Sequence, residues 1–231
     1  MSYGPYAGSP TDALRRQGIL TQVYAWMTAG LLVTGAIAMF VAGTPALVGA
    51  IVGNSLLFFG LIIGQLALVW VLSANLMRLA PAAATALFLG YAALNGLTFA
   101  VIFLAYTAES IASTFFVTAG TFGAMSAWGY FTRRDLSGIG NFLFMALIGL
   151  ILASIVNIFV ASSALYWVIT YAGVLIFVAL TAYDTQKIKH MIAEVRDEAM
   201  GQRVAIYGAL TLYLDFINLF LFLLRILGNR R

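Results

Sequence analysis

The sequence contains no cysteine and a single histidine, His190. The absence of cysteine excludes disulfides, thiolate metal sites and a cysteine nucleophile from this chain. A histidine without a second histidine or cysteine does not supply the ligands of a zinc site. The GxSxG, HExxH, Walker and GxGxxG patterns are also absent, so hydrolase, metalloprotease and nucleotide-binding functions have no basis in the sequence. We therefore expect a protein that is not an enzyme and that holds no cofactor.

Charge is scarce as well. Only 9% of the 231 residues are charged, whereas 63% are hydrophobic. A soluble globule could not cover its surface with so few polar residues, so the chain needs a lipid bilayer as its solvent and main partner. The net charge of +4 is small, and the sequence has neither a basic run nor a basic stripe with interleaved aromatics. No nucleic-acid partner is therefore expected.

Seven apolar segments are each long enough to cross a bilayer as a helix of about 20 residues. They cover residues 19–42, 55–74, 82–105, 111–131, 142–161, 164–183 and 204–227. The first is too long for the apolar core of a cleavable signal peptide, which is about 7–15 residues, so we expect it to be retained. Residues 46–53 are also apolar and either lengthen the second helix or lie at the membrane interface. The sequence thus predicts an all-α integral membrane protein: a polar cytoplasmic tail, residues 1–18, and a single seven-helix membrane domain, residues 19–231.

The distribution of lysine and arginine predicts the orientation, because cytoplasmic loops carry the excess of positive charge. With the amino terminus in the cytoplasm, nine of the twelve basic residues lie on that side. These nine are Arg15, Arg16, Arg78, Arg133, Arg134, Lys187, Lys189, Arg196 and Arg203. The exception is the carboxyl end, where Arg225, Arg230 and Arg231 would lie outside if the last helix crosses completely. Either the last helix turns back, or it crosses completely and the nine basic residues on the cytoplasmic side outweigh these three outside. We expect the second.

Two of the eight acidic residues lack an ordinary surface role. Asp215 lies about 12 residues, or ~18 Å of helix, past Arg203 and therefore near the middle of the membrane. Asp184 closes the preceding apolar segment. A carboxylate at the bilayer centre costs at least ~2.5 kcal/mol, so it normally faces a partner or a water-filled cavity. A functional role is expected for Asp215, with a structural pairing to a buried arginine or amide as the alternative, whereas Asp184 could also simply be hydrated.

Several stretches resemble the signature of the Bax inhibitor-1 family. They are AYDTQ at residues 182–186, ALTLYLDFINLF at 209–220, GLT at 96–98, GYFTRRDL at 129–136 and NIF at 157–159. The resemblance covers roughly residues 78–224, and the short amino-terminal tail is similar to that of the bacterial branch. It implies an integral, multi-pass protein of the bacterial plasma (inner) membrane.

The resemblance also implies a seven-helix bundle with the last helix at its centre, and a pH-sensitive calcium leak gated by Asp184 and Asp215. Two carboxylates within hydrogen-bond reach in a low-dielectric site share a proton and titrate as a coupled pair. With carbonyls and water they would make a weak calcium site suited to passage of the ion. Because Asp184 is expected nearer the interface than Asp215, their pairing requires tilted helices or a cytoplasmic cavity.

Arg78 ends the second apolar segment and could anchor it by extending its side chain to the interface. In the family, an arginine of the second helix resembles a latch that pairs in the closed state with the sixth-helix aspartate, here Asp184. Acid would protonate that carboxylate and release the latch.

Two alternatives to a channel stay open. Some bacterial relatives resemble substrates or modulators of a membrane-anchored ATP-dependent protease, which could grip the tail of residues 1–18. A proton-coupled transporter would also use buried acids, although the sequence shows no convincing inverted repeat or pair of helices broken by glycine or proline.

Overall fold

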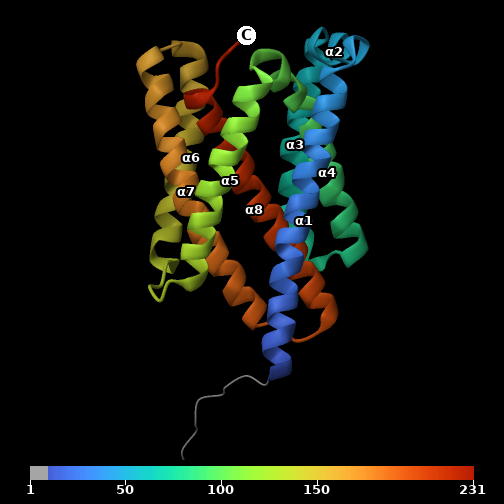
Figure 1. Ribbon diagram of the computed structural model, residues 1–231, viewed down its shortest axis with the longest axis vertical. Coiled ribbons are helices and arrows are strands. Elements are labelled where there is room, and N and C mark those ends of the chain that lie inside the picture. The colour runs from blue at the N-terminus through green and yellow to red at the C-terminus, as the bar shows by residue number, and fades with distance from the viewer. Residues whose placement is uncertain (1–9) are drawn as a thin grey trace, which may run out of the picture.

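The computed structural model describes residues 10–231, which form eight α-helices and one short 3-10 helix (Figure 1). The elements are α1 (Pro10–Ala42), α2 (Pro45–Val52), α3 (Ser55–Asn75), η1 (Leu76–Arg78), α4 (Pro81–Ala105), α5 (Ala108–Phe131), α6 (Ser137–Val160), α7 (Ser163–Ala193) and α8 (Glu198–Leu227). Six helices are long and apolar enough to cross a membrane, namely α1, α3, α4, α6, α7 and α8. The prediction of an all-helical, multi-pass membrane protein is confirmed.

Helix α5 is the segment on which the predicted count of seven spans depends. Its 24 residues could cross a bilayer, but its most apolar 18-residue stretch is less apolar than those of the six helices above. The reason is a face of small hydroxyl side chains, which includes Ser110, Thr114, Thr118 and Ser126 at intervals of four or eight residues. These side chains are buried, and α5 packs against α7 and α8. The polar character of α5 is therefore turned toward the protein, and the count of seven stays a prediction.

Two helices extend well beyond the expected apolar segments. Helix α1 begins at Pro10, so residues 10–18 of the expected polar tail are helical and continuous with the first apolar segment; residues 1–9 lie outside the described part of the chain. Arg15 fixes this extension, because it pairs with Asp12 at 3.7 Å and donates a 2.9 Å hydrogen bond to the carbonyl of Val195. Helix α7 continues to Ala193 instead of ending near residue 183. Hydropathy marks where a helix leaves the bilayer, whereas a helix ends only where its capping or backbone geometry stops it.

All of the apolar residues 46–53 except Gly53 lie in a helix of their own, α2, which Figure 1 shows beside the end of α1. Gly53 and Asn54 separate α2 from α3. The Asn54 side chain caps α3 by accepting a hydrogen bond from the Leu57 amide at 3.1 Å. Of the two alternatives, lengthening of the second helix is therefore wrong.

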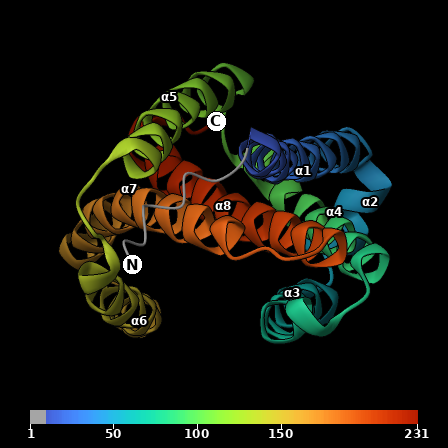
Figure 2. The same ribbon diagram turned by 90° about the horizontal axis from the view of Figure 1, so that it is seen from below.

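Helix α8 is the most buried of the six long apolar helices. In its most apolar window 61% of the residues are buried, against 11% in α3 and in α6. It packs against α1, α4, α5 and α7, and Figure 2 shows it with α1 and α4 near one end and α5 and α7 near the other. A buried hydroxyl pair joins three of these helices: Thr34 bonds the Tyr213 hydroxyl at 2.7 Å and the Ala92 carbonyl at 2.9 Å.

The carboxyl end lies at the opposite end of the bundle from the start of α1 (Figure 1). Backbone hydrogen bonds fasten it to the α4–α5 connection, from Thr107 to the Asn229 carbonyl at 3.1 Å and from Arg231 to the Ala105 carbonyl at 3.0 Å. The guanidinium of Arg230 also lies 5.9 Å from the centre of the Tyr106 ring. Helix α8 therefore runs the length of the bundle without turning back.

Candidate functional site

The structure brings Asp184 of α7 and Asp215 of α8 together. Both side chains are buried, at 8% and 4% exposure, and their carboxyl groups hydrogen-bond to each other. The expected difference in depth is removed because α8 runs obliquely through the bundle (Figure 1) and because α7 continues past Asp184 instead of ending there. Oδ2 of Asp215 is buried, and within residues 10–231 no amide or hydroxyl group donates a hydrogen bond to it. This oxygen can accept a proton, a water molecule or a cation.

Both aspartates line a cavity of about 840 Å³ bounded by α3, α4, α6, α7 and α8, which we call the α3–α6 cavity. Figure 2 shows α3 and α6 on the same side of α8, one near each end of it. The wall carries apolar side chains of α3 and α6, such as Leu66 and Ile151, which are exposed on the bundle. A carboxyl pair at the wall of a cavity meets the condition under which ionisable groups are tolerated inside a membrane.

Four amide side chains line this cavity, and three of them donate their NH₂ group to a backbone carbonyl. Gln65 bonds Leu94 at 2.8 Å, while Asn95 and Asn218 bond the carbonyl four residues earlier in their own helices, at 3.0 and 2.9 Å. The reverse orientation would set the amide oxygen against a carbonyl oxygen, so these bonds fix how each amide is turned. Of these three amides, Gln65 alone bonds to a different helix, as intramembrane amide side chains often do.

The oxygen atoms that line the cavity provide only a weak site for a hard cation. Among residues 10–231, no group of three or more carboxylate, histidine or cysteine side chains could hold a metal ion. Calcium prefers six to eight oxygen ligands. The two carboxylates would thus need amide, carbonyl or water oxygens to complete a shell, and such a site would bind the ion weakly.

Arg78 does not reach Asp184. It ends η1 with an exposed side chain, and the ion pair found within residues 10–231 joins Arg15 to Asp12. The charged neighbour of Asp184 is Lys187, three residues later on α7. No role at this site was predicted for Lys187 from the sequence, although residues three apart face the same side of a helix and the spacing could have revealed it.

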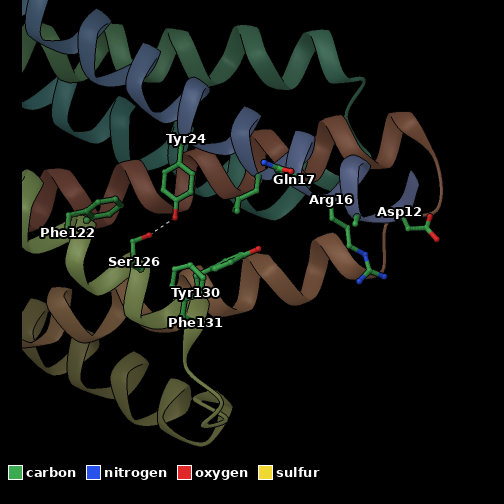
Figure 3. A pocket seen from close by; sticks show the side chains of 12 residues that line it. Asp12, Arg16, Gln17, Tyr24, Phe122, Ser126, Tyr130 and Phe131 are labelled. Atoms are coloured by element: carbon green, nitrogen blue, oxygen red, sulfur yellow. Dashed lines mark hydrogen bonds between the residues drawn. The ribbon is translucent and has the colours of Figure 1, made fainter. Parts of the chain in front are cut away.

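A second cavity, of about 810 Å³, lies between α1 and α5 (Figure 3). Tyr24 of α1 hydrogen-bonds Ser126 of α5, and Ser126 bonds the Thr185 hydroxyl of α7 at 3.0 Å. Asp12 and Arg16 lie at its far end in Figure 3. These hydrogen-bonded hydroxyls attach α7 to α5 and α1 on the side opposite the α3–α6 cavity. Thr185 directly follows Asp184 on α7, and no sequence motif predicted this contact.

Comparison with known proteins settles the family. Residues 16–231 match the family model described as "Inhibitor of apoptosis-promoting Bax1". The chain belongs to the Bax inhibitor-1 family. Bax inhibitor-1 relatives include inner membrane protein YbhL of Escherichia coli K12, 58% identical over 217 residues that cover 93% of each chain. Uncharacterized proteins of Deinococcus radiodurans (46% identical; 92% of this chain, 90% of the relative) and Borreliella burgdorferi (44%; 95% of each) are also similar.

Proposed function

We propose that this Bax inhibitor-1 protein is a pH-sensitive calcium leak of the bacterial inner membrane, gated by Asp184 and Asp215. The observation that carries the proposal is the buried, hydrogen-bonded carboxyl pair on the wall of the α3–α6 cavity, where no amide or hydroxyl group of residues 10–231 donates to Oδ2 of Asp215. The name of the YbhL relative supports the inner membrane.

The pair can respond to pH through its shared proton. With one proton between them, the carboxyl groups attract each other and hold α7 against α8. Loss of that proton leaves two like charges in a low-dielectric site, and gain of a second removes the charge that would attract a cation. Because the two groups come from different helices, each change of protonation alters the force between α7 and α8. Calcium would pass along the cavity and bind the carboxylates weakly on the way.

We further propose seven spans packed around a central α8, with the amino terminus in the cytoplasm. The start of α1 and the end of α8 lie at opposite ends of the bundle (Figure 1), which requires an odd number of crossings. The six long apolar helices and α5 give that odd number. The sequence has no cysteine, so single-cysteine variants can be labelled without background. An impermeant maleimide should label Ser163→Cys from outside and leave Asp135→Cys unlabelled in intact cells; the reverse pattern would overturn the orientation.

The leak is tested with purified protein in calcium-loaded liposomes, assayed across pH. We expect Asp215→Asn to change the calcium flux and to abolish its pH dependence, because an amide cannot share in a titrating carboxyl pair. An unchanged pH profile would refute the gating role of the pair.

Asp135→Asn is the matched control. Asp135 is exposed between α5 and α6, and its carboxylate accepts a 2.9 Å hydrogen bond from the Ser137 amide. That bond lowers the pKa of Asp135 below its usual value, so the group stays ionised at neutral and mildly acidic pH. The amide oxygen of asparagine can accept the same hydrogen bond. The control therefore removes one carboxylate without touching the cavity, and its flux profile should match that of the wild type.

A further inference from the structure

We propose that Lys187 is a tethered cation that guards one end of the α3–α6 cavity and competes with calcium for Asp184. This proposal rests on the proposed leak and names a regulator of the same site. Lys187 lines the cavity together with Asp184 and Asp215. Its position on α7, three residues after Asp184, puts both side chains on one face of the helix.

The Lys187 ammonium is held between two helices. Its Nζ lies 3.2 Å from the Tyr207 hydroxyl of α8 and 5.6 Å from the centre of the Tyr207 ring. Asp184 supplies a negative charge from α7. Tyr207 precedes Asp215 by eight residues, about two turns of α8, so the ammonium lies toward the α7–α8 loop from the carboxyl pair. The proposed topology places that loop in the cytoplasm.

An ammonium at this position opposes entry of a divalent cation. The ammonium already interacts with the negative charge of Asp184. A calcium ion that approaches from the α7–α8 loop must pass close to the ammonium, which repels it, before it reaches the carboxylate. The lysine side chain is a flexible four-carbon stem with a compact charge, and its exposed position leaves room to swing aside. Lys187 thus opposes cation entry to the carboxyl pair. Tyr207 holds its ammonium group in place, and the positive charge lowers the occupancy of the pair by calcium.

Lys189 provides a matched control on the same helix. Its Nζ donates a 2.6 Å hydrogen bond to the Tyr130 carbonyl of α5 and lies 4.9 Å from the centre of the Tyr130 ring. It carries the same charge two residues away but does not line the α3–α6 cavity. A general effect of positive charge at this end of the bundle would be shared by both lysines, whereas direct opposition to cation entry at the cavity is specific to Lys187.

The test compares Lys187→Met, Lys187→Arg and Lys189→Met with the wild type by two measurements at neutral pH. The first is calcium flux from loaded liposomes, and the second is binding of terbium, whose luminescence the cavity residues Tyr91 and Tyr183 can sensitise. Lys187→Met should raise both the flux and the terbium affinity roughly three- to tenfold, the size expected for a solvent-screened charge acting on a multivalent ion. Lys187→Arg and Lys189→Met should resemble the wild type.

Equal flux and equal terbium affinity in Lys187→Met and Lys189→Met would overturn the proposal, and so would a fall of either quantity in Lys187→Met. Lys187→Gln serves if the methionine variant inserts poorly. A wild type that carries no calcium at any pH would refute the leak itself, whereas the terbium comparison would still decide whether Lys187 opposes cation binding.

Discussion

The close contact between α5 and α7 can be tested by adding one methyl group. Gly129 of α5 lies so near α7 that a Cβ atom on it would overlap the carbonyl oxygen of Ala182, two residues before Asp184. A backbone oxygen cannot rotate aside as a side chain can, so Gly129→Ala must push the two helices apart. Gly123 is on the same helix, but a Cβ there would meet no atom of residues 10–231 within 4 Å beyond its own helix backbone and neighbours. Gly123→Ala is therefore the matched control.

The expected size follows from the difference between the two variants. Replacing glycine by alanine within a helix gains up to ~1 kcal/mol at either position, so this gain cancels in the comparison. Overpacking costs typically ~1–3 kcal/mol, and only Gly129→Ala meets it. For a chain of this size ~1 kcal/mol shifts the melting temperature by roughly 2–4 °C. In thermal unfolding in one detergent, Gly129→Ala should therefore melt about 2–12 °C below Gly123→Ala. Equal melting temperatures would refute the close approach of α5 to α7.

Three further predictions concern flux and stability. In the liposome assay, Asp184→Asn should resemble Asp215→Asn, and the double variant should be no worse than the more severe single one because the two groups act as a unit; additive effects would indicate independent sites. Arg78→Ala should leak at a neutral pH where the wild type is closed, with Arg78→Lys intermediate, if a latched state exists in which the arginine reaches Asp184; equal flux in all three would leave Arg78 as an anchor. In thermal unfolding, Thr34→Val should destabilise by ~1–3 kcal/mol because it strands the buried Tyr213 hydroxyl, whereas Tyr213→Phe should cost only ~1 kcal/mol because Thr34 keeps its bond to the Ala92 carbonyl; the opposite order would contradict the hydroxyl pair.

Composition and hydropathy were sufficient for the fold class, because a bilayer admits few solutions to a chain this apolar. They also located every long helix. The limits of α1 and α7 were wrong for a common reason: both helices continue beyond the apolar segment into a part of the chain that contacts protein and solvent. Arg15 holds one extension against the Val195 carbonyl, and Lys189 ties the other to Tyr130.

Part of the candidate site could be predicted from the sequence. A carboxylate in an apolar run is conspicuous, so Asp215 could be identified from its neighbours alone. Asp184 was also singled out but could simply have been hydrated, and the family resemblance favoured a functional role for it. The three-residue spacing indicates that Lys187 shares a face of α7 with Asp184, whereas hydropathy does not reveal which basic residue reaches the carboxyl pair. Arg78 was suggested by the resemblance, yet in the structure it ends η1 with an exposed side chain, and Lys187 lines the cavity instead. That choice depends on how α7 and α8 rotate against each other, which hydropathy does not encode.

The position of α8 in the chain has a consequence for biogenesis. The helix with the greatest buried share is the last of the seven long helices to leave the ribosome, and synthesis proceeds from the amino terminus. Until it arrives, α1, α4, α5 and α7 must persist in the membrane with the surfaces that will cover it still unfilled. The contact between α1 and α4 can form early, whereas Asp215 enters the bilayer last, and the acid that shares its hydrogen bond is already in place to receive it. Assembly of these seven helices is therefore completed only when α8 inserts, and a nascent chain that stalls before α8 would present quality-control proteases with an unfilled bundle.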